Sequence, residues 1–418
     1  MTQMEAARRG EITVEMKSVA ADEGMEPEAV RRAVAAGRLV IPANVHHTWL
    51  RPVGIGEGVR TKINSNIGTS VYDVDIGKEM EKLRVSRVHG ADALMDLSTG
   101  GDLDAIRRQL LREWDMAFGT VPIYQVMADA KDVWDATPER MLGAIEDHAR
   151  QGVDFVTVHA GVTMGAIPLV RKRTLAVVSR GGAFLLSWMM AHDTENPLLT
   201  EFDSILEIAR EHDVTLSLGD GLRPGGIVDN TDEAQIHELR VLGRLTRRAR
   251  EAGVQVMVEG PGHIPIHRVA ENVRLQKDIC DGAPFYVLGP LVTDIGPGYD
   301  HITAAIGAAV AGAAGADFLC YVTPAEHLKL PEPEDVREGV IALKIAAHAA
   351  DLAKGIPTAI ERDRAMTEAR RDLDWDRQIE LAIDPKKARR YREGSHITTE
   401  ECTMCGPYCA IKMFGGDR

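Results

Sequence analysis

The segment Val214-Thr-Leu-Ser-Leu218 is followed by Gly219-Asp-Gly-Leu-Arg223-Pro-Gly225, and this succession predicts the fold. The short apolar run favours a buried strand, and the glycine-rich run favours a loop. The next segment, Glu233–Ala252, has the spacing of an amphipathic helix. A strand, a polar loop and a helix in this order form one β/α unit of a parallel sheet.

The same unit recurs along the chain from about Thr61. The strand candidates are Thr61–Ile67, Ala93–Leu97, Val121–Gln125, Phe155–His159, Leu175–Ser179, Val214–Leu218, Gln255–Val258, Pro284–Leu288 and Asp317–Val322. Further helices are predicted at Pro138–Arg150 with Thr137 as N-cap, at Glu201–His212 and at Glu334–Lys354. The pattern predicts an α/β fold, a (β/α)8 (TIM-type) barrel, with one strand candidate too many. A doubly wound open sheet stays open, because periodicity does not separate the two.

Composition divides the chain into three predicted parts. Residues 1–60 form a small N-terminal domain with a helix at Pro27–Ala36 and an extended segment at Leu39–Pro42. Residues 61–355 form the catalytic barrel. Residues 356–418 form a charged helical arm, at Glu361–Arg392, and a cysteine-bearing tail.

Charge and hydropathy narrow the choice of partners. The 418 residues carry a formal net charge of −14, which argues against nucleic acid and anionic membranes as partners. The first 16 residues contain no apolar signal core, and no run of 18 apolar residues occurs. We therefore expect a soluble, cytoplasmic protein with a small-molecule substrate.

Polar residues gather where the predicted strands end, which is where barrel active sites form. Ser179-Arg-Gly-Gly182 suits a phosphate, because glycines admit the backbone and Arg180 adds charge. Asp220 and Arg223 suit a ribose or a polar heterocycle. Taken singly, each cluster is also consistent with a capped turn or a structural ion pair.

Two histidines in glycine-rich loops, His263 and His301, are candidate ligands of a divalent metal. Asp300 could orient a histidine or be a ligand itself. A structural role for either histidine stays the alternative.

Three of the five cysteines lie in the tail, in Cys402-Thr-Met-Cys405-Gly-Pro-Tyr-Cys409. This spacing can hold three irons of a [4Fe–4S] cluster and leave the fourth iron open to S-adenosylmethionine. Zinc with His396 nearby is the alternative. Cys280 and Cys320 are expected to be buried packing residues.

In these motifs the chain resembles the phosphomethylpyrimidine synthase (ThiC) family of thiamine biosynthesis. The shared stretches are Asn64–Gly68, Met95–Gly100, Ser179–Gly182, Gly219–Pro224, Glu259–His263, Thr293–Thr303 and Cys402–Cys409. The resemblance implies a radical S-adenosylmethionine lyase that converts 5-aminoimidazole ribotide to 4-amino-5-hydroxymethyl-2-methylpyrimidine phosphate, with release of formate and CO. It also implies an electron donor for the cluster, and a homodimer in which the tail reaches the partner's site.

Carried over residue by residue, the resemblance implies a set of ribotide-binding positions. They are Asn66, Met95, Tyr124, His159, Ser179, Arg180, Gly181, Asp220, Gly221, Leu222, Arg223, Glu259 and Tyr286. It implies a metal, zinc by expectation, at His263 and His301, and the cluster at Cys402, Cys405 and Cys409. Within this set we assign Arg180 to the phosphate, and Asp220, Arg223 and Glu259 to the ribose or imidazole.

Other functions stay open at this point. A 5-hydroxybenzimidazole synthase would use the same ribotide and cofactors to make a cobamide lower ligand. A zinc-binding barrel without radical chemistry, and an α/β protein with a metal-free tail, belong to other classes. Segment Thr163–Arg173 follows a strand end and could line the active site.

Overall fold

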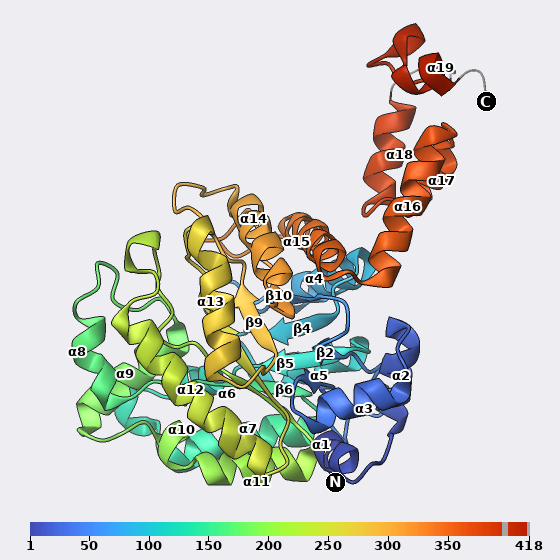
Figure 1. Cartoon of the computed structure of the whole chain (residues 1–418). Helices are drawn as coiled ribbons and strands as arrows, with labels where there is room; N and C mark the ends of the chain where they lie inside the picture. Colours follow the sequence, from blue (N-terminus) through green and yellow to red (C-terminus); the bar gives the residue numbers. More distant parts are fainter. Residues whose placement is uncertain (395–399, 416–418) are drawn as a thin grey trace. The chain divides into compact units, whose positions relative to one another are not determined.

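Eight buried strands close into a parallel barrel in the computed structural model, which describes residues 1–394 and 400–415 (Figure 1). The strand order is β10-β3-β4-β5-β6-β7-β8-β9, so the predicted barrel is confirmed and the open sheet is wrong. The strands are β3 (Lys62–Ile67), β4 (Ala93–Asp96), β5 (Ala117–Thr120), β6 (Phe155–Val158), β7 (Thr215–Leu218), β8 (Val256–Gly260), β9 (Phe285–Leu288) and β10 (Phe318–Cys320).

Helices follow the strands and cover the barrel. The longer ones are α4 (Ile76–His89), α5 (Leu103–Glu113), α6 (Pro122–Asp129), α7 (Pro138–Gln151), α9 (Arg180–His192), α11 (Phe202–His212), α12 (Glu233–Glu251), α13 (Ile266–Ile279), α14 (Asp300–Ala313) and α15 (Pro333–Lys354). Short turns are α8 (Ile167–Val170), α10 (Pro197–Thr200), η1 (Val133–Asp135), η2 (Met164–Ala166) and η3 (Ile227–Asp229). Helix α7 begins as predicted, because the Thr137 hydroxyl accepts the Arg140 N–H and Pro138 needs no partner.

The strand predicted at Val121–Gln125 is wrong. Pro122 starts helix α6 instead, and the strand lies just before it, at Ala117–Thr120. The Phe155 ring packs against Gly119 of this strand so closely that a β-carbon there would come within 2.2 Å of it. Tertiary packing, rather than β-propensity, selects the strand.

The strand predicted at Leu175–Ser179 is also wrong, and it is the ninth candidate that the barrel does not need. Strand β6 pairs directly with β7. The apolar segment is a loop in which Leu175 is 47% exposed, and Ser179 caps helix α9.

The N-terminal residues have a small apolar core of their own. They form α1 (Gln3–Arg8), α2 (Val14–Glu23), α3 (Pro27–Ala35) and the antiparallel pair β1 (Leu39–Val40) and β2 (Ile55–Gly56). The Thr2 hydroxyl donates to the Gly253 carbonyl at 2.6 Å, and the Gln3 N–H donates to the Asp213 carboxylate at 3.0 Å. The segment therefore belongs to one compact unit with the barrel, Met1–Asp351.

The second compact unit is Leu352–Arg418. It contains α16 (Pro357–Arg371), α17 (Trp375–Leu381), α18 (Pro385–Glu393), η4 (Gly406–Tyr408) and α19 (Ala410–Gly415). The Trp375 indole N–H donates to the Glu400 carbonyl at 2.6 Å, and the Arg392 guanidinium lies 4.2 Å from the Trp375 ring centroid. These contacts join the helical arm to the cysteine segment. The finer division at residues 60 and 355 stays a prediction.

No described helix has the length and the apolar character that a bilayer crossing requires.

Candidate active site

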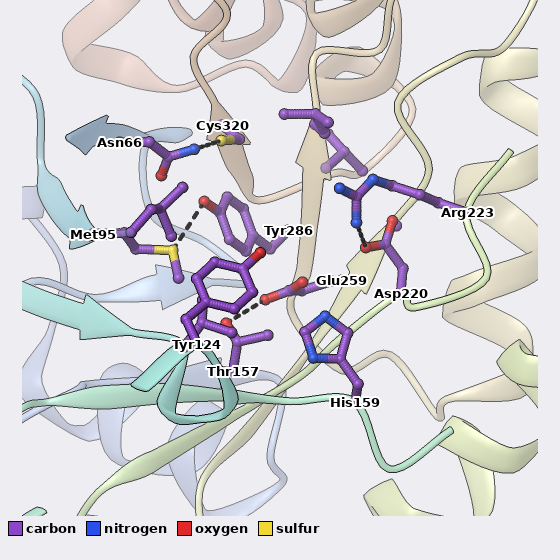
Figure 2. Close-up of a pocket in the computed structure, with 15 residues that line it drawn as sticks. Asn66, Met95, Tyr124, Thr157, His159, Asp220, Arg223, Glu259, Tyr286 and Cys320 are labelled. Carbon is purple, nitrogen blue, oxygen red and sulfur yellow. Dashed lines mark hydrogen bonds and ion pairs between the residues drawn. The ribbon is translucent and has the colours of Figure 1, made fainter. Parts of the chain in front are cut away.

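Side chains from the carboxyl ends of the barrel strands converge on one cavity, and Figure 2 shows them pointing toward one another. Of the residues expected to bind the substrate, those that line the cavity are Asn66, Met95, Tyr124, His159, Asp220, Arg223, Glu259 and Tyr286. They come from strands, from loops and, for Tyr124, from helix α6 all around the barrel, so residues far apart in sequence form one site. This is the placement that a parallel barrel imposes on its strand ends.

The remaining expected residues lie directly against this lining. The Arg180 guanidinium lies over the Tyr124 ring, 4.5 Å from its centroid, which holds both side chains by a cation–π contact. The Ser179 hydroxyl accepts the Gly182 N–H at 3.1 Å and lies 3.4 Å from the His159 ring. A β-carbon at Gly181 would come within 2.5 Å of that ring, so only glycine fits there.

Gly221 and Leu222 form the back of the loop after β7. The Leu222 N–H donates to the carboxylate of Glu238 on α12 at 2.8 Å. The Leu222 carbonyl accepts from Arg173, whose guanidinium also bonds both oxygens of Asp232. None of the residues that line the cavity belongs to segment Thr163–Arg173. Its last residue, Arg173, instead holds the loop that carries Asp220 and Arg223.

Acidic groups surround Arg223 in the cavity. Arg223 donates to Asp220 at 3.1 Å (Figure 2). Burial raises the pKa of Asp220 to about 7, against the lowering effect of Arg223, and Glu259 raises it further. Burial also raises the pKa of Glu259, whose Oε1 accepts the hydroxyls of Ser217 and Thr157 at 2.7 Å each. A carboxyl group with the pKa of Asp220 can exchange a proton near neutral pH.

His159 is held in its neutral form. Burial, and then the charge of Arg223, lower its pKa to about 3. Its Nδ1 is buried and has no hydrogen-bond partner among the described residues. A neutral imidazole with one unused nitrogen in a cavity wall is suited to a hydrogen bond with a bound ligand.

Sequence reasoning missed seven of the lining residues, of which Thr157 and Cys320 have a hydroxyl and a thiol; the others are Leu97, Val121, Gly260, Val287 and Leu288. Thr157 lies two residues before His159 on β6, and this alternation was the signal available. Cys320 is buried as expected, but it is more than a packing residue. Its sulfur accepts from Asn66 at 2.9 Å (Figure 2), and burial raises its pKa to about 12, so the thiol keeps its proton.

The predicted histidine pair is not the pair that the structure brings together. The rings of His263 and His327 lie 5.4 Å apart between centroids. His263 Nδ1 bonds Asp294 at 2.8 Å, and His327 Nδ1 bonds Asp300 at 3.2 Å. Carboxylates that hold Nδ1 in this way leave Nε2 facing a metal in many metalloproteins.

His301, near the start of α14, has other neighbours. Its Nε2 is 3.9 Å from a carboxylate oxygen of Glu338, and Tyr299 stacks on its ring. The prediction did not include His327, which lies in the loop between β10 and α15. Among the described residues, no group of three or more His, Cys, Asp or Glu side chains is arranged as a metal site.

The three tail cysteines are free thiols. Backbone N–H groups of Cys405 and Met404 lower the pKa of Cys402. Partial desolvation, and then the neighbouring thiols of Cys402 and Cys409, raise the pKa of Cys405. Cysteine thiolates are the ligands that iron–sulfur clusters use, and the three thiols influence one another although they are not arranged as a metal site in this structure. His396, named with the zinc alternative, lies outside the described residues.

A polar cavity at the carboxyl end of a closed parallel barrel defines the class of (β/α)8-barrel enzymes. A family model described as the radical SAM ThiC family matches residues 2–415, and the chain belongs to this family. Three relatives carry the name phosphomethylpyrimidine synthase. They come from Desulforamulus reducens (57% identical over 420 residues, 99% of this chain and 97% of that protein), Geobacter metallireducens (56%; 99% and 96%) and Moorella thermoacetica (57%; 99% and 98%).

A solved dihydropteroate synthase from Coxiella burnetii aligns with 70% of this chain and 94% of its own, at 13% identity and a TM-score of 0.41, too distant to carry an argument. The comparisons give no support to a 5-hydroxybenzimidazole synthase.

Proposed function

We propose that this chain converts 5-aminoimidazole ribotide to 4-amino-5-hydroxymethyl-2-methylpyrimidine phosphate, with release of formate and CO, as a radical S-adenosylmethionine lyase. One observation carries the proposal. In a chain 57% identical over nearly its whole length to a protein named phosphomethylpyrimidine synthase, eight of the thirteen residues expected to bind the ribotide line a single cavity. The site thus has the donors and acceptors that a phosphorylated ribose and an aminoimidazole require.

Individual side chains have distinct proposed tasks. Arg180 and the N–H groups at the start of α9 would hold the phosphate, because a helix N-terminus and a guanidinium both favour an anion. Asp220, Arg223 and Glu259 would bind the ribose or imidazole. The neutral His159 would accept or donate one hydrogen bond to the same ligand.

Cys402, Cys405 and Cys409 would hold the [4Fe–4S] cluster, and S-adenosylmethionine would bind at its open iron. When bound, the pair supplies the one-electron cleavage that begins radical S-adenosylmethionine reactions. The backbone N–H groups that favour the thiolate of Cys402 support this assignment. An electron donor is required as a partner.

A divalent metal, zinc by expectation, would bind the Nε2 atoms of His263 and His327. The two carboxylates that hold the Nδ1 atoms support this pair over His263 and His301. Two imidazoles leave coordination positions for ligands from outside the protein. The homodimer and the cytoplasmic location stay predictions.

The proposal is tested by an anaerobic reaction of cluster-reconstituted protein with 5-aminoimidazole ribotide, S-adenosylmethionine and reductant. Mass analysis should find the hydroxymethylpyrimidine phosphate together with 5′-deoxyadenosine, and neither in the matched Cys405→Ala protein. Deoxyadenosine without the pyrimidine would reject the substrate and keep the cofactor. Detection of 5-hydroxybenzimidazole instead would show that the chain makes a different product from the same ribotide.

A further inference from the structure

Three carboxyl groups gather around one guanidinium behind the cavity wall. Asp220, Glu238 and Glu259 all lie about Arg223, and together they line a second, smaller cavity between the barrel and helices α12 and α13. Arg173, another cation that acts on Glu238, is already bonded to both oxygens of Asp232. One guanidinium cannot balance three buried negative charges, so the cluster has to retain at least one proton.

Glu238 is the member of the cluster that the proposed reaction does not use. It lies on α12 with 2% of its surface exposed, and its Oε2 accepts the Leu222 N–H at 2.8 Å. Its Oε1 lies so near Gly221 that a β-carbon there would come within 3.3 Å. Glu238 therefore supports, from outside the barrel, the loop that carries Asp220 and Arg223.

Two buried oxygen atoms of this cluster have no hydrogen-bond partner among the described residues. They are Oε1 of Glu238 and Oδ2 of Asp220. Both residues line the small cavity, whose volume of about 20 Å³ is enough for one water molecule. Ionised carboxylates only accept hydrogen bonds, so two of them facing one cavity need a proton or a water between them.

We propose that Glu238 is a positioning residue that keeps its proton and, through one water in this cavity, holds Asp220 and Arg223 in the geometry that binds the ribotide. The protonated carboxyl donates from Oε1 toward the water and accepts from Leu222 at Oε2. Asp220 is then free to direct its other oxygen at Arg223. The proposal rests on the proposed ribotide function, which it deepens.

The electrostatics agree with this geometry. Burial, and then the charge of Asp220, raise the pKa of Glu238 well above its ordinary value. The hydrogen bond from the Leu222 N–H lowers the pKa by less, and the charges of Arg173 and Arg223 lower it by less again; Glu259 lines the same cavity.

The test uses Glu238→Gln and Glu238→Ala in the full-length protein. An amide accepts and donates at the same two places as a protonated carboxyl, so Glu238→Gln should bind ribotide within about twofold of the parent by calorimetry on cluster-free protein. Glu238→Ala leaves the buried Leu222 N–H without an acceptor and should weaken binding about tenfold. Infrared spectra of each variant, subtracted from the spectrum of the parent protein, should show the loss of a protonated-carboxyl band in both variants.

Glu233→Gln is the matched control, because Glu233 is on the same helix, 71% exposed at its side chain and paired with Lys172 at the surface. It should change neither binding nor the infrared band. A Glu238→Gln protein that binds as poorly as Glu238→Ala would show that the ionised carboxylate is required, and would overturn the proposal. Unchanged binding in Glu238→Ala would overturn it as well.

Hydrogen exchange of the segment 219–223, measured without ligand, separates this proposal from the proposed function. Exchange should rise in Glu238→Ala and stay at the parent level in Glu238→Gln. If the parent binds no ribotide but the exchange result holds, the substrate is wrong while the positioning role of Glu238 stands. If exchange is equal in all three proteins, the positioning role is wrong.

Discussion

Asp213 offers a sharp test of how burial controls this protein's stability. It ends helix α11 with a positive φ of 52°, is 4% exposed, and accepts the Gln3 N–H at 3.0 Å. Burial raises its pKa from 3.8 to about 7, although the Gln3 hydrogen bond acts in the opposite direction. Asp213→Asn removes the titration while keeping the shape, the acceptor oxygen and a residue that tolerates this backbone conformation.

The sign of the effect follows from proton binding. Between pH 4 and 7 the unfolded chain loses the proton of Asp213 while the folded chain keeps it, so the parent protein loses stability as pH rises through this window. A difference of about three pKa units corresponds to about 4 kcal/mol. Asp213→Asn should therefore match the parent below pH 4 and gain on it steadily, by about 2–3 kcal/mol between pH 5 and pH 8.

Urea-unfolding midpoints at pH 5, 6, 7 and 8, with an unchanged denaturant slope, measure this difference. Asp193→Asn is the matched control, because Asp193 also ends a helix with a positive φ, of 50°, but is exposed. Its profile should run parallel to that of the parent. A parallel profile for Asp213→Asn as well would refute the reasoning from burial.

Other expected outcomes concern the site and its cofactors. Cys405→Ala should lose the iron of the cluster, measured by elemental analysis, while the melting temperature of the barrel stays the same; retained iron would contradict the ligand assignment. Arg180→Ala should weaken ribotide binding by about 1–3 kcal/mol through loss of a charged hydrogen bond, and equal calorimetric affinity would reduce Arg180 to a turn residue. His327→Ala, but not His301→Ala, should lower the zinc content of cluster-free protein, as His263→Ala should; zinc loss in His263→Ala and His301→Ala but not in His327→Ala would restore the pair predicted from sequence.

The sequence predicted the barrel because its main signals are local. Apolar runs such as Phe155–His159 indicate a buried strand, and the glycine and polar residues after them indicate its end. N-caps such as Thr137 indicate the start of a helix. The site was predictable for a related reason, since parallel strand ends meet at one mouth once the barrel is known. Two strand predictions, at Val121–Gln125 and Leu175–Ser179, were wrong because local propensity and tertiary packing disagree there.

Contacts between distant elements were decided only by the tertiary structure. The sequence marks His263 and Asp220 as polar residues at strand ends, but it carries no signal that pairs His263 with His327 or Asp220 with Glu238. It also identifies Cys320 as buried without showing that its thiol meets Asn66. Closure of the barrel creates these neighbours, and with them the desolvation and the facing charges that set the protonation of the site.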